Sequence, residues 1–484
     1  MKTIYIFCLF IFSSLASSSL LGKPHNVILF LVDDWGWTDG GVFGSDLYET
    51  PNIDALAERG VRFTQAYATC TVCSPTRASV MTGLYPARLR VTDWIDGHTP
   101  NYTNTPMSEP DWTKKLEHSR VTIAEALREH GYKTASVGKW HLTPIVTPGS
   151  EEELAYCPDK HGFDVNIGGN QYGAPGSYFA PFSQRRKVMF NMPEAEEGKH
   201  LTECLTDEAI KLIEGWKDEP FFIYFPYYAV HTPIQGIQEL VAKYEDKIKP
   251  GMLHTNAGYA SMVESTDQSI GRILQVLENL DLADETLIIL TGDNGGLDPD
   301  DSGRITDNFP LRNGKGSVYE GGVRVPCVIY APDGRAGVVS DTPVISIDYF
   351  PTILAALGLS DDRYVTDGED LMPVVRGEAK SLEERDLFWH YPHYHTQGAT
   401  PYSAIRSGDY RLIEYHRDGN IELYNLAKDI GEQNELSREL PHIVHQLKTK
   451  LRRWLESVDA QMAVPNPKYD PEQATLPPGW ARRK

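Results

Sequence analysis

Polar side chains follow two apolar runs of the sequence, at the points where those runs end. One pair follows the run at 26–32 and the other follows the run at 286–290. The two pairs are Asp33 with Asp34, and Asp293 with Asn294. Three carboxylates and an amide oxygen are hard oxygen ligands that suit Ca²⁺ or Mg²⁺ better than zinc. Each pair alone could also form a turn or a helix N-cap, but two such pairs after buried strands favour a metal site.

Two histidines and a lysine could complete a site for an anion. Lys139 and His141 follow the apolar run at 132–137, and His231 follows the run at 221–228. In an open α/β sheet, ligands bind beyond the carboxyl ends of the strands, so these side chains are expected at one edge. A lone histidine is more often structural than catalytic, and a strand-end lysine can be a solvated charge. Their shared placement favours a functional role.

The segment Cys73-Ser74-Pro75-Thr76-Arg77 is the candidate for the nucleophile. Given six cysteines, a Cys with Pro at +2 and Arg at +4 is expected about 0.02 times by chance in a chain of this composition. The alternative is a buried cysteine in a turn before a helix. Thr82-Gly83, which follows at fixed spacing, favours the functional interpretation.

This segment resembles the signature of type I sulfatases, C-x-P-S/T-R-x-x-x-x-T-G. The resemblance extends over nearly the whole chain from Asn26 onward, and further landmarks of that family occur in family order. They are Val32-Asp33-Asp34, Thr50-Pro51-Asn52-Ile53-Asp54, Gly138-Lys139-Trp140-His141-Leu142, His231-Thr232-Pro233, Asp293-Asn294-Gly295, Gly314-Lys315-Gly316 and Glu320-Gly321-Gly322-Val323-Arg324-Val325-Pro326.

The resemblance implies a fold, two cofactors and a partner. The fold would be an alkaline-phosphatase-like α/β sandwich with a smaller C-terminal subdomain. Cys73 would be converted to formylglycine before folding finishes, by a formylglycine-generating enzyme. One Ca²⁺ would be bound by the two acidic pairs and by an oxygen of the modified cysteine. The implied ligands are Asp33, Asp34, Asp293, Asn294 and Cys73.

The resemblance also implies roles for the remaining polar residues. Arg77 would steady the aldehyde hydrate, and Lys139 and Lys315 would hold sulfate oxygens. A hydroxyl of the hydrate would attack sulfur, because a sulfate ester needs cationic groups around its oxygens and an activated nucleophile. His231, with Lys315 nearby, would protonate the leaving sugar oxygen, and His141 would deprotonate the second hydroxyl to expel sulfate.

The predicted activity is therefore hydrolysis of O-sulfate esters in a sulfated oligosaccharide or polysaccharide. Two alternatives stay open. One is a phosphoester or phosphonate hydrolase of the same superfamily, although the additional His and Asp ligands of a two-metal phosphatase cannot be assigned. The other is a glycan-binding pseudo-sulfatase, which predicts loss of the cysteine, the arginine or a metal carboxylate, and none of these is missing.

Residues that recognise the sugar belong to no shared motif. Two polar clusters with aromatic neighbours could grip sugar hydroxyls and a neighbouring anionic group, or could be ordinary surface residues. The candidates are Asp93, Trp94, Asp96 and His98 after the signature segment, and His393 and His395 near the start of the C-terminal region.

The pattern of apolar runs predicts the α/β class with a mainly parallel sheet. Strands are expected at 26–32, 132–137, 221–228, 286–290 and 325–330, and helices at 122–129, 203–216 and 259–280. After about 376 short alternating segments at 387–391, 402–406, 410–415 and 421–425, followed by a helix at 442–458, predict a small α+β subdomain. The expected divisions are a signal peptide at 1–19, a catalytic domain at 23–376 and this subdomain at 377–484.

Composition and the N-terminal segment restrict where the protein is expected to act and what it is expected to bind. The chain has 484 residues and a net charge of −21, which argues against binding of nucleic acid. A lysine followed by a short apolar run near the N-terminus predicts export to the periplasm or medium. No later stretch has the roughly 20 apolar residues needed to span a membrane, so no stable membrane insertion is expected. An anionic substrate would then require a local positive pocket.

Overall fold

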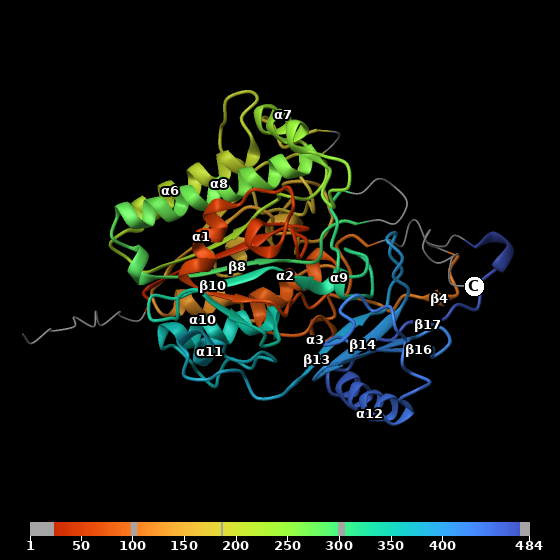
Figure 1. Ribbon diagram of the computed structural model, residues 1–484. Helices are drawn as coiled ribbons and strands as arrows, with labels where there is room; N and C mark the ends of the chain where they lie inside the picture. Colours follow the sequence, from red (N-terminus) through yellow and green to blue (C-terminus); the bar gives the residue numbers. More distant parts are fainter. Residues whose placement is uncertain (1–23, 98–103, 185–186, 299–304, 475–484) are drawn as a thin grey trace, which may run out of the picture.

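The centre of the molecule is an eight-stranded sheet (Figure 1). The computed structural model describes residues 24–97, 104–184, 187–298 and 305–474. Five of the seven strand pairings in this sheet are parallel, and β10 pairs antiparallel with both of its neighbours. In spatial order the strands are β11 (Val338–Ser340), β2 (Val61–Phe63), β10 (Cys327–Tyr330), β8 (Thr286–Gly292), β1 (Asn26–Val32), β7 (Phe221–Pro226), β5 (Lys133–Val137) and β6 (Val165–Ile167).

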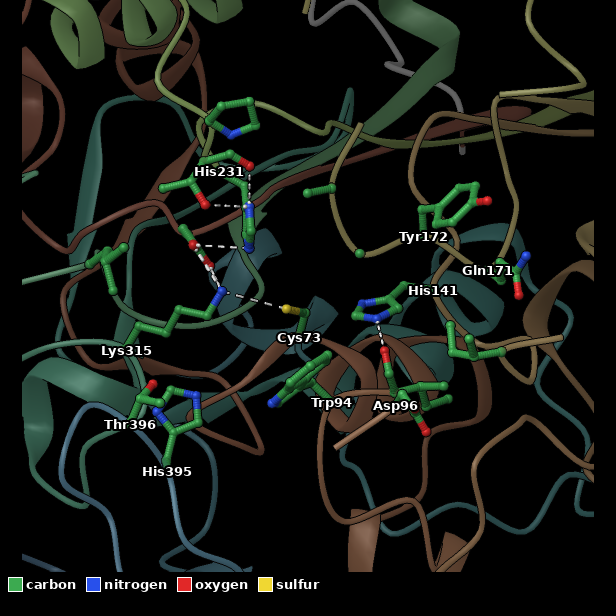
Figure 2. A pocket seen from close by; sticks show the side chains of 18 of the residues that line it. Cys73, Trp94, Asp96, His141, Gln171, Tyr172, His231, Lys315, His395 and Thr396 are labelled. Carbon is green, nitrogen blue, oxygen red and sulfur yellow. Dashed lines mark hydrogen bonds and ion pairs between the residues drawn. The ribbon is translucent and has the colours of Figure 1, made fainter. Parts of the chain in front are cut away.

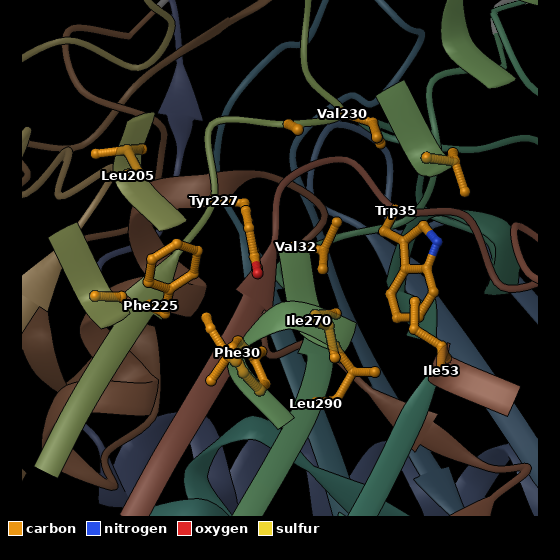
Figure 3. Packing of buried hydrophobic residues seen from close by; sticks show 14 of the residues in the cluster. Phe30, Val32, Trp35, Ile53, Leu205, Phe225, Tyr227, Val230, Ile270 and Leu290 are labelled. Carbon is orange, nitrogen blue, oxygen red and sulfur yellow. The ribbon is translucent and has the colours of Figure 1, made fainter. Parts of the chain in front are cut away.

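Strand β1 is apolar along its whole length because both faces of the sheet are covered. Successive side chains of a strand point to opposite faces, so Phe30 and Val32 enter one core while Leu29 and Leu31 enter the other. Figure 3 shows the first core, where Phe30 packs with residues from neighbouring strands and helices. The strand ends of this sheet are therefore fixed from both sides.

Helices form the outer layers. Those on the face of Phe30 are α1 (Pro51–Arg59), α6 (Leu201–Trp216), α7 (Gln238–Lys247) and α8 (Ala257–Asn279). Those on the opposite face are α2 (Cys73–Thr82), α3 (Pro86–Leu89), α4 (Ile123–Glu129), α10 (Tyr349–Leu357) and α11 (Met372–Arg376). Figure 1 shows α6 and α8 on one side of the sheet and α10 and α11 on the other.

The C-terminal region forms a second, antiparallel sheet with one helix. Its strands are β13 (Asp386–Tyr391), β14 (Tyr402–Ser407), β15 (Tyr410–Tyr415) and β16 (Ile421–Asn425), and its helix is α12 (Pro441–Ser457). Ile405 packs under α12 with Leu447 and Leu451. Its neighbour Ala404 faces the other way, into a core shared with Tyr67 and Val72 of the large unit. The second sheet is thus joined to the large unit by apolar packing.

Short elements complete the chain. Small sheets are made by β12 (Val344–Ile345), β3 (Ala66–Tyr67) and β9 (Arg324–Val325), and by β17 (Val464–Pro465) and β4 (Met107–Ser108). The remaining helices are α5 (Glu151–Leu154), α9 (Glu320–Val323) and the 3-10 turns η1 (Gly41–Phe43), η2 (Pro158–Lys160), η3 (Ala283–Glu285), η4 (Ser346–Asp348) and η5 (Pro471–Gln473).

The predicted fold class is confirmed, with one correction to a strand. The expected strand at 325–330 is two strands, because Pro326 has no N–H to donate to a ladder and the chain changes sheets there. The division after 376 stays a prediction; it falls at the end of α11, and β13 begins at Asp386. The predicted signal peptide at 1–19 lies outside the described residues. Among the described helices, none is long and apolar enough to cross a bilayer.

Candidate active site

The register of β1 and β8 brings the two acidic pairs together. Val32 of β1 lies opposite Gly292 of β8, so the residues that follow each strand leave the sheet side by side. The backbone N–H of Asp34 donates to Asp293 Oδ1 at 3.1 Å, and Asn294 Nδ2 donates to Asp34 Oδ1 at 2.8 Å. Parallel pairing thus turns two distant sequence pairs into one oxygen-rich cluster.

Two oxygens of this cluster are buried without a hydrogen bond among the described residues: Asp33 Oδ1 and Asn294 Oδ1. Buried polar atoms are normally satisfied, so both point to a missing ligand. Burial and the neighbouring Asp293 also raise the pKa of Asp33 well above its ordinary value, and a bound cation would offset both causes. The donor set consists of hard oxygens and fits Ca²⁺.

Three buried cations, two lysines and Arg77, balance the three carboxylates of the cluster. Lys139 Nζ donates to Asp33 Oδ2 at 2.6 Å. Lys315 Nζ donates to both oxygens of Asp34, at 2.6 and 2.9 Å. Because these pairs are removed from water, each member depends on the others for its charged state.

Arg77 is fully buried one turn into α2 and contacts the cluster through Asp293. Its Nε and Nη2 both donate to Asp293 Oδ2, at 3.0 and 2.7 Å, and its Nη1 donates to the carbonyl of Lys139 at 2.9 Å. Burial opposes its charge, but Asp293 and Asp33 outweigh burial and raise the pKa of Arg77. Arg77 therefore stays charged and orients both Asp293 and the Lys139 backbone.

Cys73 is the first residue of α2, and its side chain lies against this cluster. Its Sγ lies within 4.8 Å of ligand atoms of Asp33 and Asp293, and equally of Asp34 and His231. Lys315 Nζ contacts Sγ at 3.7 Å. Figure 2 shows Cys73 between Lys315 on one side and His141 on the other. The nucleophile candidate is thus surrounded by the predicted metal, anion and proton-transfer groups.

The two histidines are held in defined orientations. His141 Nε2 bonds the carbonyl of Ile95, which leaves its buried Nδ1 without a hydrogen bond in the described part of the chain. His231 Nδ1 bonds the carbonyl of Thr232 at 2.7 Å, and its Nε2 lies 3.6 Å from Asp34 Oδ2. Burial, then Lys139, lowers the pKa of His141 well below its ordinary value; burial, then Lys315, lowers the pKa of His231 to about 3.

A cavity of about 630 Å³ opens over Cys73. Both histidines and Lys315 line it, and so do aromatic and polar side chains from three separate segments. Its lining is Asp34, Cys73, Trp94, Ile95, Asp96, His141, Ile145, Gln171, Tyr172, Gly173, Ala174, Lys187, His231, Thr232, Pro233, Leu297, Lys315, His395, Thr396 and Gln397.

The structure brings three of the predicted substrate residues to this cavity: Trp94, Asp96 and His395. Asp93 is fully buried and accepts a hydrogen bond from Tyr391 at 2.7 Å. His393 is also fully buried, bonded to Thr92 and paired with Glu109. Neither lines the cavity, because each serves the junction between the large unit and the C-terminal sheet. His98 lies outside the described residues.

Sequence reasoning missed the wall made by Gln171, Tyr172 and Lys187. These residues belong to no motif, and no hydrophobic period marks their segment. For His395, which was predicted, a further signal was present at Gly316, whose φ is +71° and whose Cβ would lie 1.9 Å from His395 Nδ1. A glycine next to Lys315 indicated a close approach, although not its partner.

Comparison with known proteins agrees with this site. The sulfatase family model matches residues 25–359, and the model of the N-sulphoglucosamine sulphohydrolase C-terminal region matches residues 313–459. A sulfatase of Formosa agariphila is 32% identical, with 96% of this chain and 97% of that protein aligned. The N-acetylgalactosamine-6-sulfatase of Canis lupus familiaris is 31% identical over 76% of this chain and 69% of that protein.

A solved structure is similar over most of the chain. It is the crystal structure of Ps i-CgsB in complex with k-i-k-neocarrahexaose, with 27% identity, a TM-score of 0.73, and coverage of 90% of this chain and 93% of that one. The family model covers more than half of the sequence, and its match includes every residue of the cluster around Cys73. The chain therefore belongs to the sulfatase family of sulfuric ester hydrolases.

Proposed function

We propose that the protein hydrolyses an O-sulfate ester of a sulfated carbohydrate, using formylglycine made from Cys73 and one bound Ca²⁺. The observation that carries the proposal is the position of Cys73 at the base of the cavity, in contact with Lys315 and between two oriented histidines. A sulfate group above Sγ would meet positive charge on one side and proton-transfer groups on both sides.

An unmodified Cys73 is a poor nucleophile in this environment. Burial raises the pKa of the thiol, against the lowering effect of Lys139 and Lys315, so the thiol stays protonated. Formylglycine, when hydrated, supplies a hydroxyl nucleophile that is regenerated in each cycle. The partner required for this conversion is a formylglycine-generating enzyme.

The residues assigned to Ca²⁺ are Asp33, Asp34, Asp293 and Asn294, together with the oxygen of modified Cys73. The ion would supply positive charge next to the reacting sulfate. The two unsatisfied oxygens described above support this assignment. Lys139 and Lys315 would hold the sulfate oxygens, each retained in place by its own aspartate.

The two histidines have complementary hydrogen bonds. The Nδ1–H of His231 donates to the Thr232 carbonyl, so Nε2 is the atom that carries a proton into the cavity when the ring is charged. A bound sulfate ester favours that charged form, because an anion raises the pKa of a neighbouring histidine. The Nε2–H of His141 donates to Ile95, which leaves Nδ1 as a base. His231 would therefore protonate the leaving oxygen, and His141 would remove the proton that triggers release of sulfate.

A carbohydrate fits the cavity better than a small aryl group. Trp94 and Tyr172 offer aromatic faces, and Asp96 and His395 offer polar atoms at the same opening. The relatives described above include an N-acetylgalactosamine-6-sulfatase and a protein in complex with k-i-k-neocarrahexaose. With the signal peptide expected at 1–19, we place the reaction in the periplasm or the medium.

The test combines mass spectrometry with an activity screen. Protein co-expressed with a formylglycine-generating enzyme should show a tryptic peptide at Cys73 that is lighter by about 18 Da than the thiol form, as expected when –CH2SH loses sulfur and two hydrogens and gains one oxygen. It should release sulfate from sulfated oligosaccharides, and Cys73→Ala should not. Hydrolysis of phosphoesters or phosphonate esters at a higher kcat/KM than that for sulfate esters would favour the alternative hydrolase. Oligosaccharide binding without turnover by the fully converted protein would favour a binding protein.

A further inference from the structure

The segment at 170–174 is fixed against the ring of His141. The backbone N–H of His141 donates to the carbonyl of Asn170 at 3.1 Å. A Cβ built on Gly173 would lie 2.4 Å from His141 Cε1, so the Gly173 backbone lies directly on the imidazole. Figure 2 shows Gln171 and Tyr172 beyond His141 as seen from Cys73. This wall is therefore held at a set distance from the reacting centre.

Lys187 is anchored to the same wall. Its Nζ donates to the carbonyl of Ala174 at 3.0 Å, and the side chain lines the cavity. Two residues of chain span at most about 7 Å. With the hydrogen bond added, the Lys187 ammonium lies within about 10 Å of the Gly173 backbone that covers His141. One or two sugar rings can bridge such a distance.

The charge of Lys187 is not balanced by a carboxylate among the described residues. The other lysine of the cavity lining, Lys315, is paired with Asp34. Burial lowers the pKa of Lys187, and Lys139 lowers it further. The ammonium has three donors and the Ala174 carbonyl uses one, so two are available to a ligand. A partly buried ammonium without a carboxylate partner is stabilised when an anion binds next to it.

We propose that Lys187 binds a second anionic group of the substrate, a sulfate or carboxylate that is not the one hydrolysed. The inference rests on the proposed function and narrows its substrate to saccharides with at least two anionic groups. The net charge of −21 would repel such a substrate at long range, so a cation inside the cavity is needed to select it. Tyr172, whose ring centroid lies 5.9 Å from Lys187 Nζ, offers a face for the sugar that carries this group.

The test measures binding without turnover. Three saccharides with the same 6-sulfate are titrated by calorimetry into the Ca²⁺-loaded Cys73→Ala chain, which has no nucleophile at position 73. They are N-acetylgalactosamine 6-sulfate, N-acetylgalactosamine 4,6-disulfate and the chondroitin 6-sulfate disaccharide, which carries a carboxylate in place of the second sulfate. We expect one of the two doubly charged ligands to bind about ten- to a hundredfold more tightly than the monosulfate, as for one added charged hydrogen bond. Which one does so identifies the anion.

Adding Lys187→Met should remove that advantage, and Lys187→Arg should retain most of it. Lys211→Met, at an exposed lysine of α6, is the matched control and should leave the ratio of affinities unchanged. The inference is overturned if neither second anion tightens binding, if the advantage survives in Lys187→Met, or if none of the saccharides binds. Failure of the converted wild-type protein to release sulfate from any ester would instead overturn the proposed function.

Discussion

The two oxygens of the Asp33 carboxylate have different surroundings. Oδ2 accepts a hydrogen bond from Lys139 at 2.6 Å, whereas Oδ1 accepts none from the described chain and lies 3.5 Å from Arg77 Nη2. A residue that only paired with lysine would not need a second buried, unsatisfied oxygen. This asymmetry is what a metal ligand shows when the lysine holds one oxygen and the ion takes the other.

Replacing this carboxylate should therefore affect metal binding first. Asp33→Asn keeps the shape but removes the charge, so Ca²⁺ affinity should fall at least tenfold and kcat/KM about a thousandfold. Calorimetric Ca²⁺ titration and sulfate release measure the two effects. Asp367→Asn, which removes a partner of Arg88 away from the cavity, is the control. Unchanged Ca²⁺ affinity in Asp33→Asn would exclude this residue as a ligand.

His254 should make stability depend on pH. Its Nδ1 faces Asp46 Oδ1 at 2.9 Å and its Nε2 faces the carbonyl of Asp307 at 3.0 Å, so both nitrogens meet acceptors and the charged ring is favoured. Burial alone would lower the pKa of His254, but Asp39 and Asp46 outweigh it and raise the pKa to about 9. The ordinary value is about 6.5.

A folded-state pKa above the unfolded one stabilises the protein fully below about pH 6.5, and this stabilisation is lost as the pH rises through 9. Allowing for the partial exposure of Asp46, the loss should be about 2 kcal/mol. His254→Gln can still donate a hydrogen bond but does not titrate. Denaturant unfolding of both proteins between pH 6 and 10 should show the wild-type advantage shrinking as the pH rises; a constant difference would contradict the prediction.

The candidate catalytic and metal residues could be found in the sequence because each occupies a strand end or a spaced motif. Their contacts could not, since these depend on strand register, as for Asp34 and Asp293. The burial of Asp93 and His393 could not be predicted from the sequence either. It arises from Tyr391 and Glu109, which reach them from other parts of the chain. Lys187 gave no signal because its role depends on a cavity rather than on its neighbours in sequence.

At the scale of elements, the end of β5 determines where Lys139 and His141 lie. Gly138 follows the strand with a φ of +129°, and a Cβ there would lie 2.0 Å from the carbonyl oxygen of Pro226. Only glycine allows this close approach of two backbones. The strand end can therefore deliver a buried lysine and a histidine of positive φ to the same edge.

Gly138→Ala should destabilise the protein by about 3 kcal/mol or more, from steric overlap and backbone strain together. Activity should fall as well, because the adjacent Lys139 must shift. Gly131→Ala is a matched control: its φ is also positive, at +83°, but nothing lies within 4 Å of its Cβ. That variant should lose only about 1 kcal/mol and keep its activity. Equal losses in thermal unfolding would show that strain alone, without the overlap, determines the cost.

Element prediction succeeded where a single period dominates. The predicted strand at 26–32 is β1 to the residue, and the predicted helix at 259–280 is α8, shifted by at most two residues. It failed at 325–330, where the apolar run continues through Pro326 but the pairing changes from one sheet to another. An apolar run indicates that a strand is buried, but it does not indicate which strand pairs with it.

At the scale of the whole molecule, Ca²⁺ should stabilise the fold, because its proposed ligands come from the ends of β1 and β8 in the central sheet. A ligand present at 100 times its Kd adds about 2.7 kcal/mol, which for a chain of this size raises Tm by a few degrees. Calorimetric scans with excess Ca²⁺ and with a chelator measure the shift. Asp293→Asn should be nearly insensitive to the ion. A wild-type Tm that is the same under both conditions would contradict a structural contribution of the site.

His395, Thr396 and Gln397 reach the cavity from a loop of the C-terminal sheet, and Ala399 of that loop donates to the carbonyl of Gly316, next to Lys315. The large unit supplies the proposed catalytic residues, whereas this loop supplies part of the cavity wall. Part of the cavity wall is thus encoded in a stretch of the gene well separated from the proposed catalytic residues. Substitutions in this loop should therefore change which sulfated sugar fits the cavity more than they change the hydrolytic step.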